Sequence, residues 1–128
     1  AWGQYGKLDV LEHVLVCVET DDGHVGYAEA PARPSIYGET PQSIETIINN
    51  YLAPKLLGVD IHDANLLKTF QSVANNHTAK GALDIALCEA KAKSEGSSLF
   101  AATTGTREKI RASFILGISD LGTMIKEA

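Results

Sequence analysis

The chain contains 128 residues, which is enough for one domain with a buried core. It is 45% hydrophobic and 21% charged, a composition typical of globular proteins that excludes disordered and collagen-like chains. Sixteen acidic and eleven basic side chains give a net charge of −5, so we expect no nucleic acid as a partner. The longest apolar run, residues 14–18, is far shorter than a membrane-spanning helix, so we expect no membrane as a partner either.

The chain has two cysteines, Cys17 and Cys88, far apart and without a C-x-x-C spacing. Two distant cysteines are too few for the disulfide scaffold of a small secreted protein, so we expect a cytoplasmic protein. Each cysteine lies within an apolar run. We therefore predict that both are buried in the core, where a thiol is inert.

An antiparallel hairpin is predicted near the start of the chain. Residues 12–20 contain a run rich in β-branched side chains, and residues 25–30 resume an extended pattern. The Asp22-Gly23 pair between them is a strong hairpin signal.

The next segment, residues 31–39, contains two prolines and a glycine, which exclude regular structure, so we predict a loop. It leaves Arg33, Ile36 and Tyr37 available for contacts. Loops on rigid scaffolds often carry binding residues. A surface loop without a function is an equally good interpretation of these residues alone.

Three helices are predicted after this loop. Thr40 and Pro41 begin the first, which Pro54 stops or kinks. The second is capped by Asp60 and runs to about Asn75. The apolar residues of the first fall on one helical stripe: Ile44, Ile47, Ile48, Tyr51 and Leu52.

The third predicted helix covers residues 79–95 and ends at Gly96. Its many small residues indicate a central helix packed closely on several sides. Residues 97–105 suggest one more short helical turn, and strict alternation over Ile110–Ile118 predicts a strand. Residues 122–128 then begin another helix.

The ionisable side chains give no strong motif for chemistry. The histidines His13, His24, His62 and His77 lack the spacing of a metal site, so we interpret them as ordinary strand, turn and helix-end residues. Asp60, His62 and Asp63 could hold a metal, but helix capping by the two carboxylates is the better interpretation.

Neither a nucleophile elbow nor a phosphate-binding loop occurs. Lys91 and Lys93 form a K-x-K pattern, which we interpret as a solvated helix end whose cations complement the helix dipole.

Several short motifs occur in a fixed order along the chain. They are Glu19-Thr20-Asp21-Asp22-Gly23, Val25-Gly26-Tyr27-Ala28-Glu29-Ala30, Tyr37-Gly38-Glu39-Thr40 and Ala79-Lys80-Gly81-Ala82-Leu83-Asp84-Ile85-Ala86-Leu87. Their order resembles the N-terminal capping domain of the mandelate racemase/muconate lactonising branch of the enolase superfamily, from about Val10 to the end of the chain. Within this branch, the segment Ser113–Ile118 is similar to dipeptide epimerases and N-acylamino-acid racemases, and next to muconate cycloisomerases.

The resemblance implies an α+β fold, with an antiparallel sheet followed by a helical bundle. In this family the sheet has three strands, and the opening strand would lie before Ala1. Residues 1–108 would form the capping domain. Residues 109–128 would form the first strand and the start of the first helix of a truncated (β/α)₈ barrel.

The resemblance also implies a Mg²⁺-dependent isomerase that abstracts a proton α to a carboxylate, with its base and metal ligands on the barrel. Those positions lie beyond Ala128, so we expect no catalytic residue, cofactor or metal in this chain and predict it to be inactive alone. The expected partners are a small-molecule carboxylate, the barrel domain and, as a possibility, further copies of the chain.

Two loops of the family select the substrate, and the resemblance places them at residues 1–7 and 31–39. The candidate specificity residues are Tyr5, Arg33, Pro34, Ile36 and Tyr37. The alternative hypothesis is a free-standing binding or self-assembly module derived from the cap, without catalysis. In such a module the lone strand at residues 110–118 would need a partner, because an unpaired apolar edge favours association.

Overall fold

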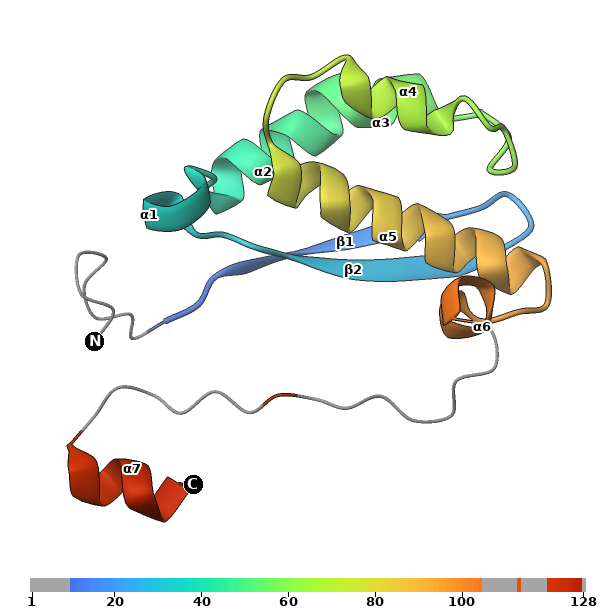
Figure 1. Ribbon diagram of the computed structural model, residues 1–128. Helices are drawn as coiled ribbons and strands as arrows, with labels where there is room; N and C mark the ends of the chain where they lie inside the picture. The colour runs from blue at the N-terminus through green and yellow to red at the C-terminus, as the bar shows by residue number, and fades with distance from the viewer. Residues whose placement is uncertain (1–9, 105–112, 114–119, 128) are drawn as a thin grey trace.

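The computed structural model describes residues 10–104, 113 and 120–127, and it has the expected α+β fold. The elements follow the order β1 (His13–Glu19), β2 (Val25–Pro31), α1 (Pro34–Tyr37), α2 (Pro41–Ile47), a π-helical segment (Ile48–Leu52), α3 (Ala53–Leu56), α4 (Leu66–Gln71), α5 (His77–Ser94), α6 (Leu99–Thr104) and α7 (Leu121–Glu127). Helix α5 lies across one face of the β1–β2 hairpin, and α2 and α3 run beside it in the helical layer (Figure 1).

The predicted hairpin is confirmed. Strands β1 and β2 pair in antiparallel register from His13 opposite Pro31 to Glu19 opposite Val25. The turn between them closes on Gly23, whose φ of 85° suits a residue without a Cβ.

The two faces of the hairpin differ in burial. Val14, Val16 and Val18 point toward the helices and belong to the core or pack against it, whereas Leu15 and Cys17 on the opposite face are exposed. Cys17 is therefore not a core residue, and the prediction of its burial is wrong. An apolar run does not tell which alternate residues of a strand face inward.

Helix α5 confirms the prediction of a closely packed central helix. Ala79, Ala82, Ala86 and Ala90 are all buried, and Gly26 of β2 lies directly against the backbone of the helix. Gly96, with a φ of 66°, follows the end of the helix as expected. Cys88 lies on an exposed part of this helix, so the prediction of its burial is also wrong.

The helix that begins at Pro41 changes from α-helical to π-helical geometry before Pro54. Thr40 caps it as predicted, and the Thr40 hydroxyl accepts a hydrogen bond from the Ser43 amide at 3.1 Å. Residues Ile48–Leu52 are π-helical, and the Ala53 amide donates to the Ile48 carbonyl. Because proline lacks an N–H and clashes with the preceding turn, a wider turn accommodates Pro54.

The second predicted helix is shorter than expected. Helix α4 covers only Leu66–Gln71, and the residue before it, Asn65, makes no side-chain cap. Asp60 and Asp63 instead accept hydrogen bonds from the amides of His62 and Asn65, at 2.9 and 2.8 Å. These are turns closed by aspartate side chains, so the prediction that Asp60 caps a helix is wrong.

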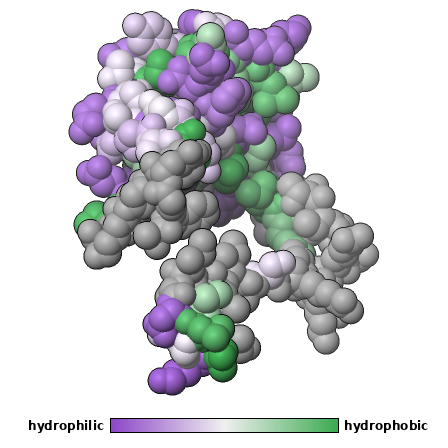
Figure 2. Space-filling model, turned by 60° about the vertical axis from the view of Figure 1, so that its left-hand side comes forward, coloured by the Kyte–Doolittle hydropathy of each residue, from purple (hydrophilic) through white to green (hydrophobic). Residues whose placement is uncertain are grey.

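After residue 104, the structure describes only residues 113 and 120–127. Helix α6 confirms the predicted helical turn, and α7 confirms a helix near the end of the chain. In Figure 2, α7 presents hydrophobic and hydrophilic residues side by side. The predicted strand Ile110–Ile118 and the boundary between residues 108 and 109 lie outside the described residues, apart from Ser113.

Side chains of α5 cover the outer edge of β2. The Tyr27 amide donates to the Glu89 carboxylate at 2.5 Å, and the Lys93 ammonium donates to the Val25 carbonyl at 2.7 Å. Glu89 and Lys93 also form an ion pair at 3.1 Å. Lys93 is thus more than a solvated helix end, because its ammonium group binds a backbone carbonyl at the edge of β2.

The outer edge of β1 is open within the described residues. The Ala32 amide donates to the Glu12 carbonyl, and the Thr20 amide donates to the His24 carbonyl. The backbone N–H and C=O groups of the even-numbered residues of β1 are therefore directed toward β2. In an antiparallel ladder the odd-numbered residues then direct their backbone groups to the other side. The backbone groups of Leu15, Cys17 and Glu19 therefore face away from β2.

Glu89 makes the stability of the chain depend on pH. Hydrogen bonds from the Tyr27 amide and from Lys93 hold the pKa of Glu89 below its usual range. A lowered folded-state pKa contributes stability above the unfolded-state pKa, about 4.3, and this contribution disappears as pH falls through the folded-state value. We expect Glu89→Gln to lower the free energy of unfolding at pH 7, and the difference from wild type to shrink below about pH 4.

Urea denaturation at several pH values between 2 and 7 measures this difference. Glu45→Gln is the matched control, because Glu45 is an exposed carboxylate of α2 without a partner among the described residues. A Glu89→Gln difference that stays constant across this range would contradict the assignment.

Candidate functional site

The segment from Arg33 to Glu39, here called the 33–39 loop, carries four of the five candidate specificity residues. It is more ordered than the sequence predicted, because residues Pro34–Tyr37 form the one-turn helix α1. Pro34 occupies the first helical position, where a missing N–H costs nothing, and the Tyr37 amide donates to the Arg33 carbonyl at 2.8 Å. The prediction of an irregular loop is therefore wrong over these four residues.

The base of the 33–39 loop is closed by backbone contacts. Arg33 and Glu39 form an isolated antiparallel bridge. Gly38 ends α1 with a φ of 74°, and its amide donates to the Pro34 carbonyl at 3.1 Å. The loop is thus a short closed excursion of the chain between β2 and α2.

The candidate side chains of this loop are accessible. Tyr37 is 59% exposed and Ile36 is 43% exposed, Pro34 is exposed, and Arg33 is half-buried. Among the described residues, neither the Arg33 guanidinium nor the Tyr37 hydroxyl has a side-chain partner. A guanidinium binds a carboxylate through two parallel hydrogen bonds, so the loop offers groups that suit a small acid. Tyr5 lies outside the described residues.

Glu39 is the important residue of this region for which the sequence predicted no role. Its side chain is charged and yet buried, with 5% exposure, and no other charged residue in the described part of the chain is buried. Its carboxylate accepts hydrogen bonds from the Thr78 amide at 2.9 Å and from the Ala79 amide at 3.0 Å. No local signal in the sequence could have found this role, because Asn76 and Thr78 at the start of α5 are themselves residue types that cap helices.

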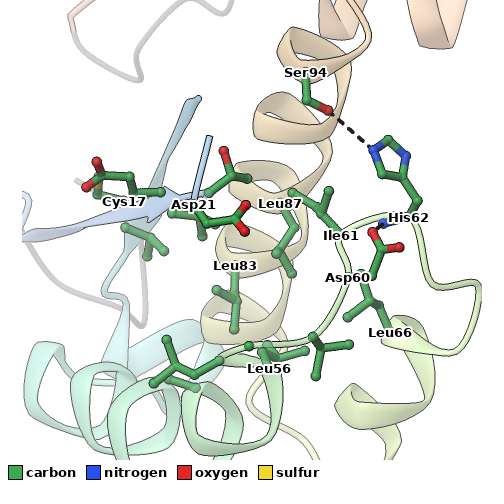
Figure 3. A pocket seen from close by; sticks show the side chains of 18 of the residues that line it. Cys17, Asp21, Leu56, Asp60, Ile61, His62, Leu66, Leu83, Leu87 and Ser94 are labelled. Atoms are coloured by element: carbon green, nitrogen blue, oxygen red, sulfur yellow. Dashed lines mark hydrogen bonds between the residues drawn. The ribbon is translucent and has the colours of Figure 1, made fainter. Parts of the chain in front are cut away.

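A cavity of about 640 Å³ lies at the other end of the hairpin. It is bounded by β1, the β1–β2 turn, the π-helical segment with α3, the residues before α4 and one side of α5 (Figure 3). No residue of the 33–39 loop lines it. The cavity and the candidate specificity residues are therefore separate features of the fold.

His62 at this cavity contacts two neighbours that suggest a catalytic triad. Its Nδ1 lies 3.2 Å from a Glu95 carboxylate oxygen, and its Nε2 lies 3.5 Å from the Ser94 hydroxyl (Figure 3). The Ser94 hydroxyl, however, donates its proton to the Lys91 carbonyl at 2.8 Å. Because that proton is not directed at His62, the arrangement does not activate a nucleophile.

The remaining polar candidates have structural partners. His13 pairs with Glu29 at 2.7 Å on the exposed face of the hairpin, and His24 lies 3.6 Å from Asp22. His77 is exposed at the first position of α5. A hydrogen bond from Thr20 lowers the pKa of Asp22.

Neither Asp63 nor Cys88 shows the features of a reactive group. Hydrogen bonds from Asn65 lower the pKa of Asp63. Although Cys88 is exposed as a residue, desolvation of its thiol by neighbouring atoms and the nearby charge of Asp84 raise the pKa of that thiol, which disfavours the reactive thiolate.

Metal binding finds no support in the described part of the chain. Within residues 10–104, 113 and 120–127, no three His, Cys, Asp or Glu side chains come together as metal ligands. The resemblance places the Mg²⁺ ligands on the barrel, and the described residues hold no set of side chains of that kind. The described helices also include none that is long and apolar enough to cross a bilayer.

The fold and the loop define an α+β domain in which a hairpin carries helices on one face and an exposed loop at one end. Residues 6–101 match the family described as mandelate racemase / muconate lactonizing enzyme, N-terminal domain, and the chain belongs to this family. The resemblance drawn from the motifs is confirmed.

Curated relatives support the same assignment. The chain is 32% identical to the L-Ala-D/L-Glu epimerase of Clostridium acetobutylicum over 95% of this chain and 35% of that enzyme. It is 33% identical to muconate cycloisomerase 1 of Rhodococcus opacus over 90% of this chain and 32% of that enzyme. The chain thus spans about a third of the length of these relatives.

Solved structures agree with these relatives. The muconate lactonizing enzyme from Mycobacterium smegmatis, solved with muconolactone, matches with a TM-score of 0.85 and 40% identity over 91% of this chain and 32% of that protein. The L-Ala-D/L-Glu epimerase of Bacillus subtilis, solved with substrate, matches with a TM-score of 0.86 and 29% identity over 91% of this chain and 33% of that protein.

Proposed function

We propose that this chain is the capping part of an enzyme that racemises, epimerises or cycloisomerises a small carboxylate. The observation that supports this most directly is the family match over residues 6–101, together with relatives that are epimerases, racemases and cycloisomerases. Abstraction of a proton α to the carboxylate on a separate (β/α)₈ barrel is part of the proposal. The base and a Mg²⁺ ion would belong to that barrel, and residues 109–128 would begin it.

The role proposed for this chain is selection of the substrate. The 33–39 loop offers a cation and a phenol without partners in the described chain, beside an exposed apolar side chain, Ile36. These groups suit a ligand with an acidic or amide-bearing end and an apolar portion. A loop at the mouth of a barrel would also exclude water from the reaction. Tyr5 would contribute from the other specificity loop.

The complete reading frame that encodes this chain tests the proposal. We expect the complete enzyme to exchange the α proton of at least one of three probes for deuterium in D₂O: an L-Ala-Glu dipeptide, an N-succinyl amino acid or muconolactone. We also expect EDTA to abolish this exchange and Mg²⁺ to restore it. A complete protein that exchanges none of the probes contradicts the proposal and favours the free-standing module.

Arg33 and Tyr37 are expected to control selectivity rather than metal binding. We expect Arg33→Ala and Tyr37→Ala each to change the ratio of kcat/KM between two substrates by about tenfold, because each removes a contact to the variable part of the substrate. The Mg²⁺ concentration for half-maximal activity stays unchanged. Steady-state kinetics of the complete enzyme on two dipeptides measures both quantities.

Ser35→Ala is the control, since Ser35 is an exposed residue of the same helix. A substrate ratio unchanged in both Arg33→Ala and Tyr37→Ala removes these residues from the proposed site.

A further inference from the structure

Glu39 joins the 33–39 loop to a distant helix. Its two carboxylate oxygens accept separate hydrogen bonds from the Thr78 and Ala79 amides, which lie 39 and 40 residues further along the chain. These amides belong to the first turn of α5, where backbone N–H groups have no partner within the helix. The residue before α5, Asn76, provides no side-chain cap. Glu39 therefore caps α5 from another part of the chain.

This link is strong for physical reasons. A carboxylate that accepts backbone N–H groups forms charge-assisted hydrogen bonds, which are stronger than neutral ones. Its negative charge also lies at the positive end of the dipole of an 18-residue helix. Glu39 is 5% exposed, so little water competes for these bonds.

The rest of the 33–39 loop has little else to hold it. Helix α1 contains no buried residue, and it follows an N-cap position without a side-chain hydrogen bond. The bridge between Arg33 and Glu39 closes the loop on itself but does not join it to another element. The start of the loop continues directly from β2, next to the hydrogen bond from the Ala32 amide to the Glu12 carbonyl. Glu39 therefore determines how the far end of the loop is fixed relative to α5.

We infer that Glu39 is a positioning residue that fixes the 33–39 loop against the N-terminus of α5 and thereby sets substrate selectivity. This inference rests on the proposed function. Glu39 is buried, so it acts through Arg33 and Tyr37 and not by touching the substrate. A loop shifted by about 1 Å is enough to change a rate by two orders of magnitude when its side chains position a substrate.

Two variants remove the same link from opposite partners. Glu39→Gln keeps the size of the side chain but loses the charge and turns one acceptor into a donor. Thr78→Pro removes one donated N–H and leaves the Glu39 side chain unaltered. Thr78 is the second residue of α5, so its N–H has no partner within the helix and no intrahelical bond is lost. The second variant keeps the test valid if the first fails to fold. Thr40→Ala is the matched control, because it removes a cap from α2 and leaves the link to α5 in place.

Amide hydrogen exchange of the 128-residue chain gives the first measurement. We expect Glu39→Gln to speed exchange at Thr78 and Ala79, and Thr40→Ala to leave both amides unchanged. Unchanged exchange at Thr78 and Ala79 in Glu39→Gln overturns the inference, because the Glu39 carboxylate would then not protect these two amides in solution. This measurement does not depend on catalysis.

Kinetics of the complete enzyme gives the second measurement. We expect Glu39→Gln and Thr78→Pro to change the ratio of kcat/KM between two substrates by about tenfold in the same direction, with Thr40→Ala within about twofold of wild type. Faster exchange with an unchanged ratio would show that Glu39 is a helix cap alone, which overturns the inference. If the wild-type enzyme acts on no probe, the proposed function fails and the selectivity role fails with it, while the exchange result still reports whether Glu39 anchors the loop.

Discussion

Gly26→Ala is expected to lower the free energy of unfolding by about 3 kcal/mol or more, at or above the upper end of the usual cost of overpacking. A Cβ at position 26 would lie 2.0 Å from the Ala86 carbonyl oxygen and 2.6 Å from the Ala90 nitrogen. Both atoms belong to the backbone of α5, so no side-chain rotation relieves the contact. Strand β2 and α5 have to separate, and the core between them loses its packing. Thermal unfolding should show a Tm lower by about 10 °C or more.

Gly81→Ala is the matched control for this experiment. Gly81 lies within α5, and a Cβ there would meet no atom within 4 Å apart from its chain neighbours and the helix's own backbone. Alanine in a helix interior is favoured over glycine by roughly 0.5–1 kcal/mol, so we expect this variant to be slightly more stable than wild type. A Gly26→Ala variant that loses less than about 1 kcal/mol would mean that β2 and α5 lie farther apart in solution.

The contact at Gly26 shows what the sequence could and could not predict. The small residues of α5 correctly predicted close packing on the helix, because a row of alanines leaves room for a neighbouring backbone. The Asp22-Gly23 turn correctly predicted the hairpin, since its signal is local. The sequence could not show that β2 is the strand that packs against α5. The contact joins Gly26 to Ala86, about 60 positions further along the chain, and such a distant contact leaves no local pattern.

The wrong predictions have the same physical origin. Cys17 lies in an apolar strand and Cys88 in an apolar helix, yet both are exposed, because an apolar run does not fix which side chains face inward. The Asp60 carboxylate could accept a hydrogen bond either as a helix cap or within a turn, and in the structure it accepts from the His62 amide within a turn. Glu39 has its partners in α5, so no reasoning within the 33–39 loop could assign them.

The candidate site was predictable to a smaller extent than the fold. The sequence indicated Arg33 and Tyr37 because they are polar or aromatic groups in a loop, and the structure leaves both without side-chain partners in the described chain. It did not indicate that the loop contains a helical turn, because proline and glycine usually break helices, whereas Pro34 and Gly38 lie at the first position and the end of this turn. Proline can begin a short helix and glycine can end one, so their presence does not exclude a helix between them.

Leu52→Ala is expected to lower the free energy of unfolding by about 3 kcal/mol, whereas Tyr51→Ala changes it by less than about 1 kcal/mol. A regular α-helix would place both residues on the apolar stripe that begins at Ile44. The π-helical segment alters this register, so that Leu52 is 0% exposed and Tyr51 is 54% exposed. Leu52→Ala leaves a cavity in the core, and Tyr51→Ala removes mostly solvated atoms.

The comparison of these two neighbours therefore tests the register of the helix before Pro54. Urea denaturation of both variants measures it, with Leu57→Ala as the control for loss of an exposed leucine, since Leu57 is 80% exposed. Equal losses from Tyr51→Ala and Leu52→Ala would contradict the π-helical register and favour the regular stripe. A large loss confined to Leu52 means that the wider π-helical turn directs Leu52, and not Tyr51, into the core with Ile44 and Ile48.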